Sequence, residues 1–169
     1  MRLHIKLLYC LAVLLVFVIP TWAEPDFSGT WKLNVRESNF GSLGDSGSLF
    51  GPDEAIRVID QSGSFLKVRL FQSGGTDEIT AELIFRTDGT ECTNELEVYS
   101  LTSKMYWKGD NLLVKSHLEI DPFYPDLEDL WDLSEDGAKL TINRRLRAMS
   151  GADYQKLVFD KQELGGLIL

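Results

Sequence analysis

The stretch that decides the fold covers residues 27–41, FSGTWKLNVRESNFG. Trp31, Leu33 and Val35 alternate with polar residues, which is the pattern of a β-strand with one buried face. Gly29, two residues before the tryptophan, permits a tight bend where this strand begins. The stretch therefore predicts a first strand that carries Trp31 into the interior of a β-protein.

The residues that precede this stretch have the features of an export leader. Arg2 and Lys6 supply positive charge, residues 7–19 are apolar, and residues 21–23 (TWA) offer small side chains at the signal-peptidase positions. We expect a signal peptide over residues 1–23, and a mature domain over residues 24–169 in the periplasm or outside the cell. The alternative is an uncleaved anchor, because the apolar run is of borderline length for a bilayer. After cleavage, no membrane span is expected.

The bulk properties of the expected mature chain restrict its partners. Its 146 residues suit one domain with a single core. Loss of Arg2 and Lys6 takes the net charge from −9 to −11. An acidic surface repels phosphate backbones, so no nucleic acid partner is expected, and it argues against adsorption to anionic membranes. Cys92 is the only cysteine outside the leader, which excludes an internal disulfide.

Alternation continues along the chain in short runs that turn sequences separate. Ser62-Gly63, Asp88-Gly89 and Asp136-Gly137 are typical of tight turns. Runs are expected at residues 55–61, 64–72, 77–87, 94–101, 103–108, 111–121, 127–133, 138–147 and 153–160. Regular hairpin spacing without a helix or a long crossover predicts an all-β fold, a single antiparallel up-and-down β-barrel of about 8–10 strands.

The two ends of this barrel are expected to differ. Residues 38–54, rich in glycine and serine, are predicted to cross one end as a long loop. Gly29 and Trp31 are predicted to form the base at the other end. Arg144, on the apolar face of its strand, is the candidate cation for the Trp31 ring and is expected to be structural.

The opening Gly-x-Trp of residues 29–31 resembles the first strand of the calycin superfamily, which includes lipocalins and fatty-acid-binding proteins. Residues 27–33 and 38–40 are similar to the opening of the latter. Residues 29–34, 87–89, 131–141 and 156–162 also resemble a group of small exported bacterial proteins of unassigned function. The resemblance extends over nearly the whole domain and implies a lipocalin-like β-barrel.

The sequence departs from the fatty-acid-binding proteins in two regions. A glycine- and serine-rich segment follows the first strand, where those proteins have two lid helices. The Arg-x-Tyr that grips the ligand carboxylate on their last strand corresponds to Leu157-Val158-Phe159. Three apolar side chains cannot hold a carboxylate, so carboxylate binding by that mechanism is not expected.

Few residues are suited to catalysis or to metal binding. His117 is the only histidine outside the leader, and no Gly-x-Ser-x-Gly elbow is present. The acidic run at residues 121–136 does not have the spacing of a calcium loop. We therefore expect no enzyme activity, no cofactor and no metal site.

The interior of the barrel leaves two alternatives for function. A small barrel is either filled by side chains or just wide enough for one ligand. We expect an exported, non-enzymatic protein that binds a small hydrophobic or amphipathic ligand. The candidate ligand-binding residues are Trp107, Phe123, Tyr124 and Trp131. The alternative is an envelope-associated interaction or inhibitor module with a solid core and no ligand. Neither the ligand nor the oligomeric state follows from the sequence.

Overall fold

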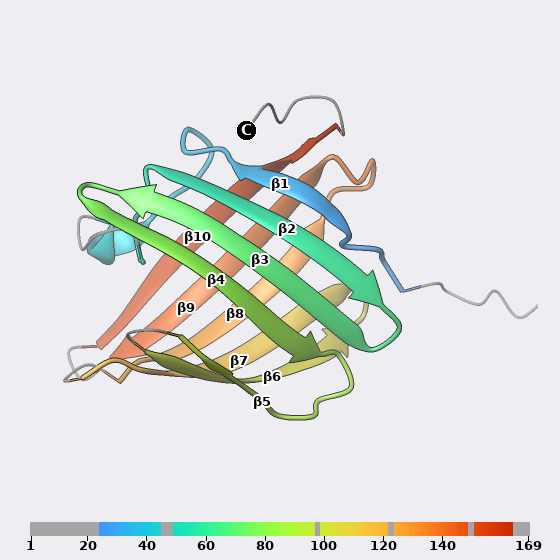
Figure 1. The fold of residues 1–169 in the computed structure, drawn as a ribbon. Helices are drawn as coiled ribbons and strands as arrows, with labels where there is room; N and C mark the ends of the chain where they lie inside the picture. Colours follow the sequence, from blue (N-terminus) through green and yellow to red (C-terminus); the bar gives the residue numbers. More distant parts are fainter. Residues whose placement is uncertain (1–23, 45–48, 97–98, 122–123, 149–150, 164–169) are drawn as a thin grey trace, which may run out of the picture.

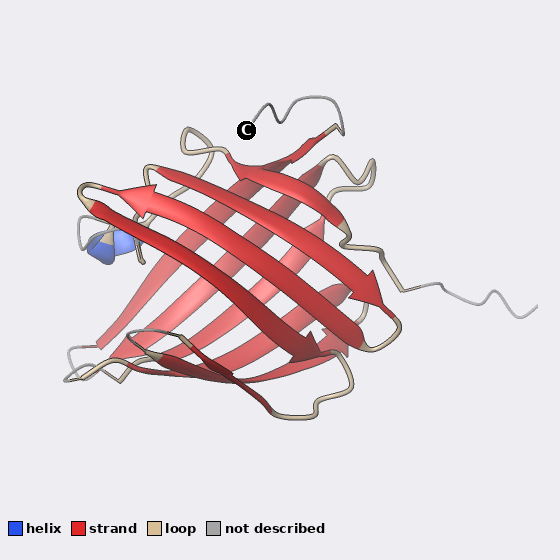
Figure 2. Ribbon diagram, in the orientation of Figure 1, coloured by secondary structure: helices blue, strands red, loops and turns tan. Residues whose placement is uncertain are grey.

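The chain folds as a nearly closed antiparallel barrel (Figure 1; Figure 2). The computed structural model describes residues 24–44, 49–96, 99–121, 124–148 and 151–163, so the predicted leader and Phe123 lie outside the described residues. The described strands are β1 (Gly29–Leu33), β2 (Glu54–Ser62), β3 (Phe65–Gly74), β4 (Asp77–Arg86), β5 (Cys92–Glu95), β6 (Ser100–Lys108), β7 (Asn111–Glu119), β8 (Asp126–Leu133), β9 (Lys139–Ala148) and β10 (Gly151–Gln162). The predicted all-β up-and-down barrel is confirmed.

Strands that are neighbours in the sheet are also consecutive in the chain, except where β1 pairs with β10. The order is β4-β3-β2-β1-β10-β9-β8-β7-β6-β5, and every pairing is antiparallel. Figure 1 shows β1 (blue) beside β10 (red), so the first and last strands of the chain are neighbours. Glycines with positive φ angles occupy the turns at Gly63, Gly109 and Gly137, where an L side chain would be strained.

One predicted strand boundary is wrong. The sequence predicted separate runs at residues 94–101 and 103–108, whereas β6 passes through Thr102 without interruption. Leu101, Ser103 and Met105 keep one inward alternation, and Thr102 pairs with His117 of β7. The hairpin bend lies earlier, where the Leu96 amide donates to the Tyr99 carbonyl at 2.9 Å.

The base of the barrel is a dry aromatic cluster. Trp31 is fully buried and its Nε1 donates to the Phe27 carbonyl oxygen at 3.0 Å. The Phe27 ring packs against Trp107 and Trp131, with ring centroids 6.1 Å and 6.3 Å apart. The cation over the Trp31 ring is Lys161, at 5.1 Å, and not Arg144 as the sequence suggested. Arg144 instead bonds to a carboxylate deeper in the barrel.

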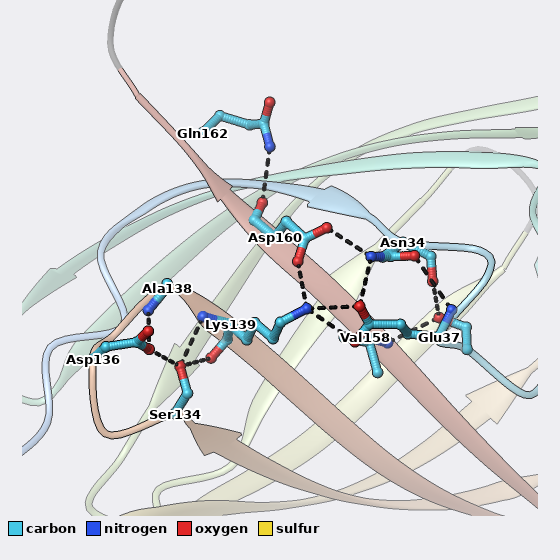
Figure 3. A network of polar contacts seen from close by, with 10 residues as sticks. Asn34, Glu37, Ser134, Asp136, Ala138, Lys139, Val158, Asp160 and Gln162 are labelled. Atoms are coloured by element: carbon cyan, nitrogen blue, oxygen red, sulfur yellow. Dashed lines mark hydrogen bonds and ion pairs between the residues drawn. The ribbon is translucent and has the colours of Figure 1, made fainter.

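A polar network on the outside ties the exit of β1 to the last two strands (Figure 3). Lys139 Nζ bonds to Glu37 at 2.8 Å and to Asp160 at 3.0 Å. Asn34 Nδ2 donates to Asp160 at 2.8 Å, and the Val158 amide donates to Ser38 Oγ at 2.9 Å. Because these residues come from both ends of the chain, the network supports the β1–β10 closure.

The seam between β4 and β5 is bridged by a side chain. Asn94 is buried, its Oδ1 accepts from the Ile84 amide at 2.7 Å, and its Nδ2 donates to the Ile84 carbonyl at 3.1 Å. The Asn94 carboxamide thus makes the two hydrogen bonds to Ile84 that the backbone of a paired strand residue would otherwise make.

Asn94→Ala is expected to lower the free energy of unfolding by about 1–3 kcal/mol, because the amide and the carbonyl of Ile84 both lose their hydrogen-bond partner. Urea denaturation and hydrogen exchange at the Ile84 amide would measure this. Thr93→Ala, on the exposed face of the same strand, is the control and should change stability by less than about 0.5 kcal/mol. Equal effects of the two changes would show that the bridge contributes nothing specific.

Candidate functional site

A cavity of about 90 Å³ lies inside the barrel, at the end opposite the Trp31 base. It separates the aromatic base from a second apolar cluster formed by Phe50, Leu118, Leu127 and Leu146. Its apolar lining comes from Leu49, Phe50, Val68, Leu70, Leu83, Phe85, Tyr99, Leu101, Val114, Leu118, Leu127 and Trp131. The barrel is therefore not completely filled by side chains. The interaction-module alternative requires a solid core, so the cavity counts against it.

The described parts of the loop after β1 cover this end of the barrel. Leu49 and Phe50 line the cavity, and the 3-10 turn η1 (Gly41–Leu43) lies against β10. Gln155 on β10 is buried, and its Nε2 donates to the carbonyls of Phe40 at 2.7 Å and Phe50 at 2.9 Å. This amide holds the loop over the cavity.

An ion pair lies in the cavity wall. Arg144 on β9 binds Asp129 on β8 through two parallel hydrogen bonds, Nε to Oδ1 and Nη2 to Oδ2, each 2.8 Å long. Both side chains are largely buried. Burial disfavours the charge of Arg144, but the attraction and hydrogen bonds from Asp129 outweigh it and raise the pKa of Arg144. A paired, hydrogen-bonded geometry of this kind is the one in which buried charges are tolerated.

A second guanidinium lies in the same wall without such a partner. Arg57 on β2 is 8% exposed and lies over the rings of Phe159 and Trp131, at 4.9 Å and 5.6 Å from their centroids. Among the described residues, its Nε has no hydrogen-bond partner. Burial, followed by repulsion from Arg144, lowers the pKa of Arg57 to about 10. Arg57 therefore stays charged at neutral pH, at a cost in stability.

The charges that line the cavity do not balance. Arg57 and Arg144 carry two positive charges, and Asp129 is the only acidic side chain among the described lining residues. Both Asp129 oxygens are already bonded to Arg144. The cavity consequently combines an apolar wall with one uncompensated positive charge. It can hold a small molecule that has an apolar body and an anionic group.

The candidate site residues from the sequence lie in different places. Trp131 lines the cavity, with its Nε1 buried and unpaired within the described part of the chain. Trp107 packs beside Phe27 at the base, and Tyr124 is 54% exposed with its hydroxyl bonded to Asp121. Neither Trp107 nor Tyr124 lines the cavity, because Trp107 on β6 lies at the base and Tyr124 lies on the surface, just before β8 begins.

Sequence reasoning missed Arg57 and Asp129. A signal was present, because each charged residue occupies an inward position of an alternating run. Arg57 lies between Ala55 and Ile59, and Asp129 lies between Leu127 and Trp131. A charge on the apolar face of a strand indicates a buried partner or a ligand. Of these three charged residues, only Arg144 was recognised from the sequence by this rule.

Among the residues considered for catalysis or metal binding, His117 lies outside the cavity, whereas Asp129 of the acidic run lies in its wall. His117 is exposed on the outer face, with Nδ1 2.8 Å from Asp126 Oδ1. Within the described ranges, no three histidine, cysteine or acidic side chains gather closely enough to hold a metal ion. The described residues also contain no helix with the length and hydropathy needed to cross a membrane.

Comparison with known proteins supports the fold. No protein-family model matches the sequence, and no curated protein matches it. Among solved structures, a secretory abundant heat soluble protein from Ramazzottius varieornatus is 14% identical with a TM-score of 0.58, covering 83% of this chain and 98% of its own. Zebrafish ileal bile acid-binding protein with cholic acid is 15% identical with a TM-score of 0.53, covering 80% and 98%.

A third similar structure is the fatty-acid-binding protein of Manduca sexta. It is 11% identical, with a TM-score of 0.51, and the match covers 80% of this chain and 99% of that protein. These proteins are β-barrels of the calycin type. Because their sequence identities to this chain are low, the similarity supports the fold and nothing further. The expected resemblance is confirmed at that level, and this chain has a calycin-type β-barrel fold.

Proposed function

We propose that this barrel binds a small amphipathic anion, with the apolar body in the cavity and the charged group near Arg57. The observation that carries the proposal is Arg57 itself, a buried guanidinium with no carboxylate of its own among the described residues, since Asp129 is bonded to Arg144. An anionic ligand group would supply that partner and offset the cost of burying the charge.

The cavity has room for the apolar body of a small ligand. Its volume of about 90 Å³ is several times the roughly 10–15 Å³ that a site needs to hold one water molecule. A flexible alkyl chain with one anionic end matches an apolar lining that carries one excess positive charge. Octanoate is therefore a suitable probe.

The similar structures support a binding role over catalysis. The zebrafish protein is described with cholic acid, and the Manduca sexta protein is named for fatty acids; both ligands join an apolar body to a carboxylate. The last-strand residues Leu157, Val158 and Phe159 of this chain are apolar. In this proposal Arg57 on β2 takes the anion-binding role instead. We further propose that the protein acts in the periplasm or outside the cell, without enzymatic activity.

The direct test is a titration of the purified protein with octanoate and with 1-octanol, followed by Trp fluorescence and by native mass spectrometry. Trp131 lines the cavity and should report occupancy. Octanoate is expected to bind about 10- to 100-fold more tightly than the alcohol, the range expected for a hydrogen bond to a charged group. Equal affinities would overturn the role of Arg57, and no binding of either molecule would overturn the proposed function.

The affinity for octanoate should depend on pH in a bell-shaped manner. Below about pH 5 the ligand carboxylate becomes protonated and loses its charge. The pKa of Arg57 is about 10, so affinity is expected to fall again as the pH rises through that value. Isothermal titration calorimetry from pH 4 to pH 11 would measure both limbs. A flat profile above pH 9, up to the limit of protein stability, would contradict the assignment of Arg57.

A further inference from the structure

Six basic side chains gather on the outer wall formed by β6–β10. Two adjoining hollows of about 400 Å³ and 470 Å³ lie on this wall and share Glu128 and Arg145. Arg144 also borders one hollow, but its guanidinium binds Asp129 inside the barrel. The other lysines and arginines that line them are Lys104, Lys108, Lys115, Arg145, Arg147 and Lys156, and the acidic residues are Glu91, Asp126 and Glu128. We call these nine residues the outer basic face.

Strand register places like charges side by side on this face. Lys104 lies directly opposite Lys115, an arrangement that costs stability in an antiparallel pair. The ion pairs that relieve it are long and exposed: Lys104 to Glu91 at 3.4 Å, and Lys115 to Glu128 at 3.7 Å. Such exposed pairs contribute little to folding, so the cations are not arranged primarily for stability.

Arg145 lies at the centre of this face and is incompletely paired. It is opposite Glu128 on β8 and Tyr154 on β10, and its guanidinium lies 5.8 Å from the centroid of the Tyr154 ring. Among the described residues, its Nε is buried without a hydrogen-bond partner. No ion pair joins Arg145, Arg147 or Lys156 to any acid in the described ranges. These cations are available to an anionic partner.

The charge is segregated over the molecule. The outer basic face carries +3, while the whole chain carries −9, so the remainder carries −12. Exposed charges are screened beyond about 8 Å at physiological salt. A partner in contact with this wall therefore meets a positive surface, even though the average charge argues against anionic partners.

We propose that the outer basic face docks on the surface of a membrane that contains anionic phospholipids. Its cations extend over five strands, roughly 19 Å at the usual strand spacing, which suits an array of headgroups better than one small anion. Tyr106 and Tyr154 are exposed among them, with half-buried Leu113 and Leu130 between. Rings with a polar tip, interspersed with lysine and arginine, are suited to a membrane interface.

The test uses the protein recovered in its exported form, in flotation with two kinds of vesicle. One kind is pure phosphatidylcholine, and the other holds equal parts of phosphatidylcholine and phosphatidylglycerol. Binding is expected only to the anionic vesicles, and it should be lost between about 0.1 M and 1 M salt, where screening shortens from about 10 Å to 3 Å. An apolar leader or tail would bind both vesicles regardless of salt, so that result would overturn the proposal.

A matched pair of variants separates this face from net charge. Lys104→Gln/Lys115→Gln/Arg145→Gln should weaken binding to anionic vesicles at least tenfold, because each cation near such a surface contributes about fivefold. Lys32→Gln/Lys67→Gln/Arg69→Gln removes the same charge from β1 and β3 and should leave membrane binding within about twofold of the unchanged protein. Thermal unfolding would verify that both variants fold.

Three further outcomes would overturn the proposal. They are equal weakening by both triple variants, no binding of the unchanged protein to anionic vesicles, and tighter binding to a DNA duplex than to the vesicles. The last would identify the face as a polynucleotide site. None of these outcomes bears on octanoate binding in the cavity, so this inference and the proposed function can fail separately.

Discussion

Arg57→Met is expected to abolish tight anion binding and, at the same time, to stabilise the ligand-free barrel. The folded-state pKa of Arg57, about 10, lies below its ordinary value, so folding disfavours the charged form at every pH below about 10. The corresponding cost is on the order of 3 kcal/mol, and it disappears as the pH rises above 10. Methionine retains much of the apolar contact without the charge.

The measurement is the unfolding temperature without ligand, together with the octanoate affinity. We expect the temperature to rise by several degrees, at about 2–4 °C per kcal/mol for a chain of this size, and octanoate binding to weaken by at least tenfold. Arg69→Met, on the exposed face of β3, is the matched control and should change neither quantity. A destabilised Arg57→Met protein that still binds octanoate would show that Arg57 is a structural residue.

Asp129→Asn is expected to be the most destabilising of the single substitutions considered. It leaves Arg144 buried beside Arg57 without a carboxylate, and breaking one partner of a buried ion pair costs about 3–5 kcal/mol. At about 2–4 °C per kcal/mol, the unfolding temperature should fall by roughly 6–20 °C. Asp132→Asn, exposed on the same strand, should have almost no effect.

A double substitution distinguishes lost charge pairing from a general disturbance of β8. Asp129→Leu/Arg144→Met removes both charges and should recover most of the lost stability, because apolar residues often replace a buried pair without cost. Asp129→Asn leaves a second uncompensated positive charge in the cavity wall. The affinity for octanedioate, relative to the affinity for octanoate, should therefore be higher than in the unchanged protein. If Asp129→Asn is no more destabilising than Asp132→Asn, the ion pair has no structural role.

Particular residues show why the candidate site was harder to predict than the strands. Trp131 and Trp107 carry the same signal in the sequence, an aromatic ring on an apolar strand face, yet Trp131 lines the cavity and Trp107 lies at the base. Alternation predicts which residues face the interior of the barrel. It does not predict the position of each residue along the barrel axis, which is here called its height. Height depends on shear and register, which are properties of all strands together.

The sequence by itself determined the strands, their turns and the two unlike ends of the barrel. These features depend on two-residue periodicity, on glycine at positive φ and on local composition, all of which act between neighbours in the chain. Only the tertiary structure decided that Asp129 binds Arg144, that Lys161 covers Trp31, and that Arg57 Nε has no hydrogen-bond partner among the described residues. Lys161 and Trp31 come from the last and first strands, and Asp129 meets Arg144 only in the register in which β8 and β9 pair. Coulomb and hydrogen-bond energies depend on distances that exist only once the strands have paired and the barrel has closed.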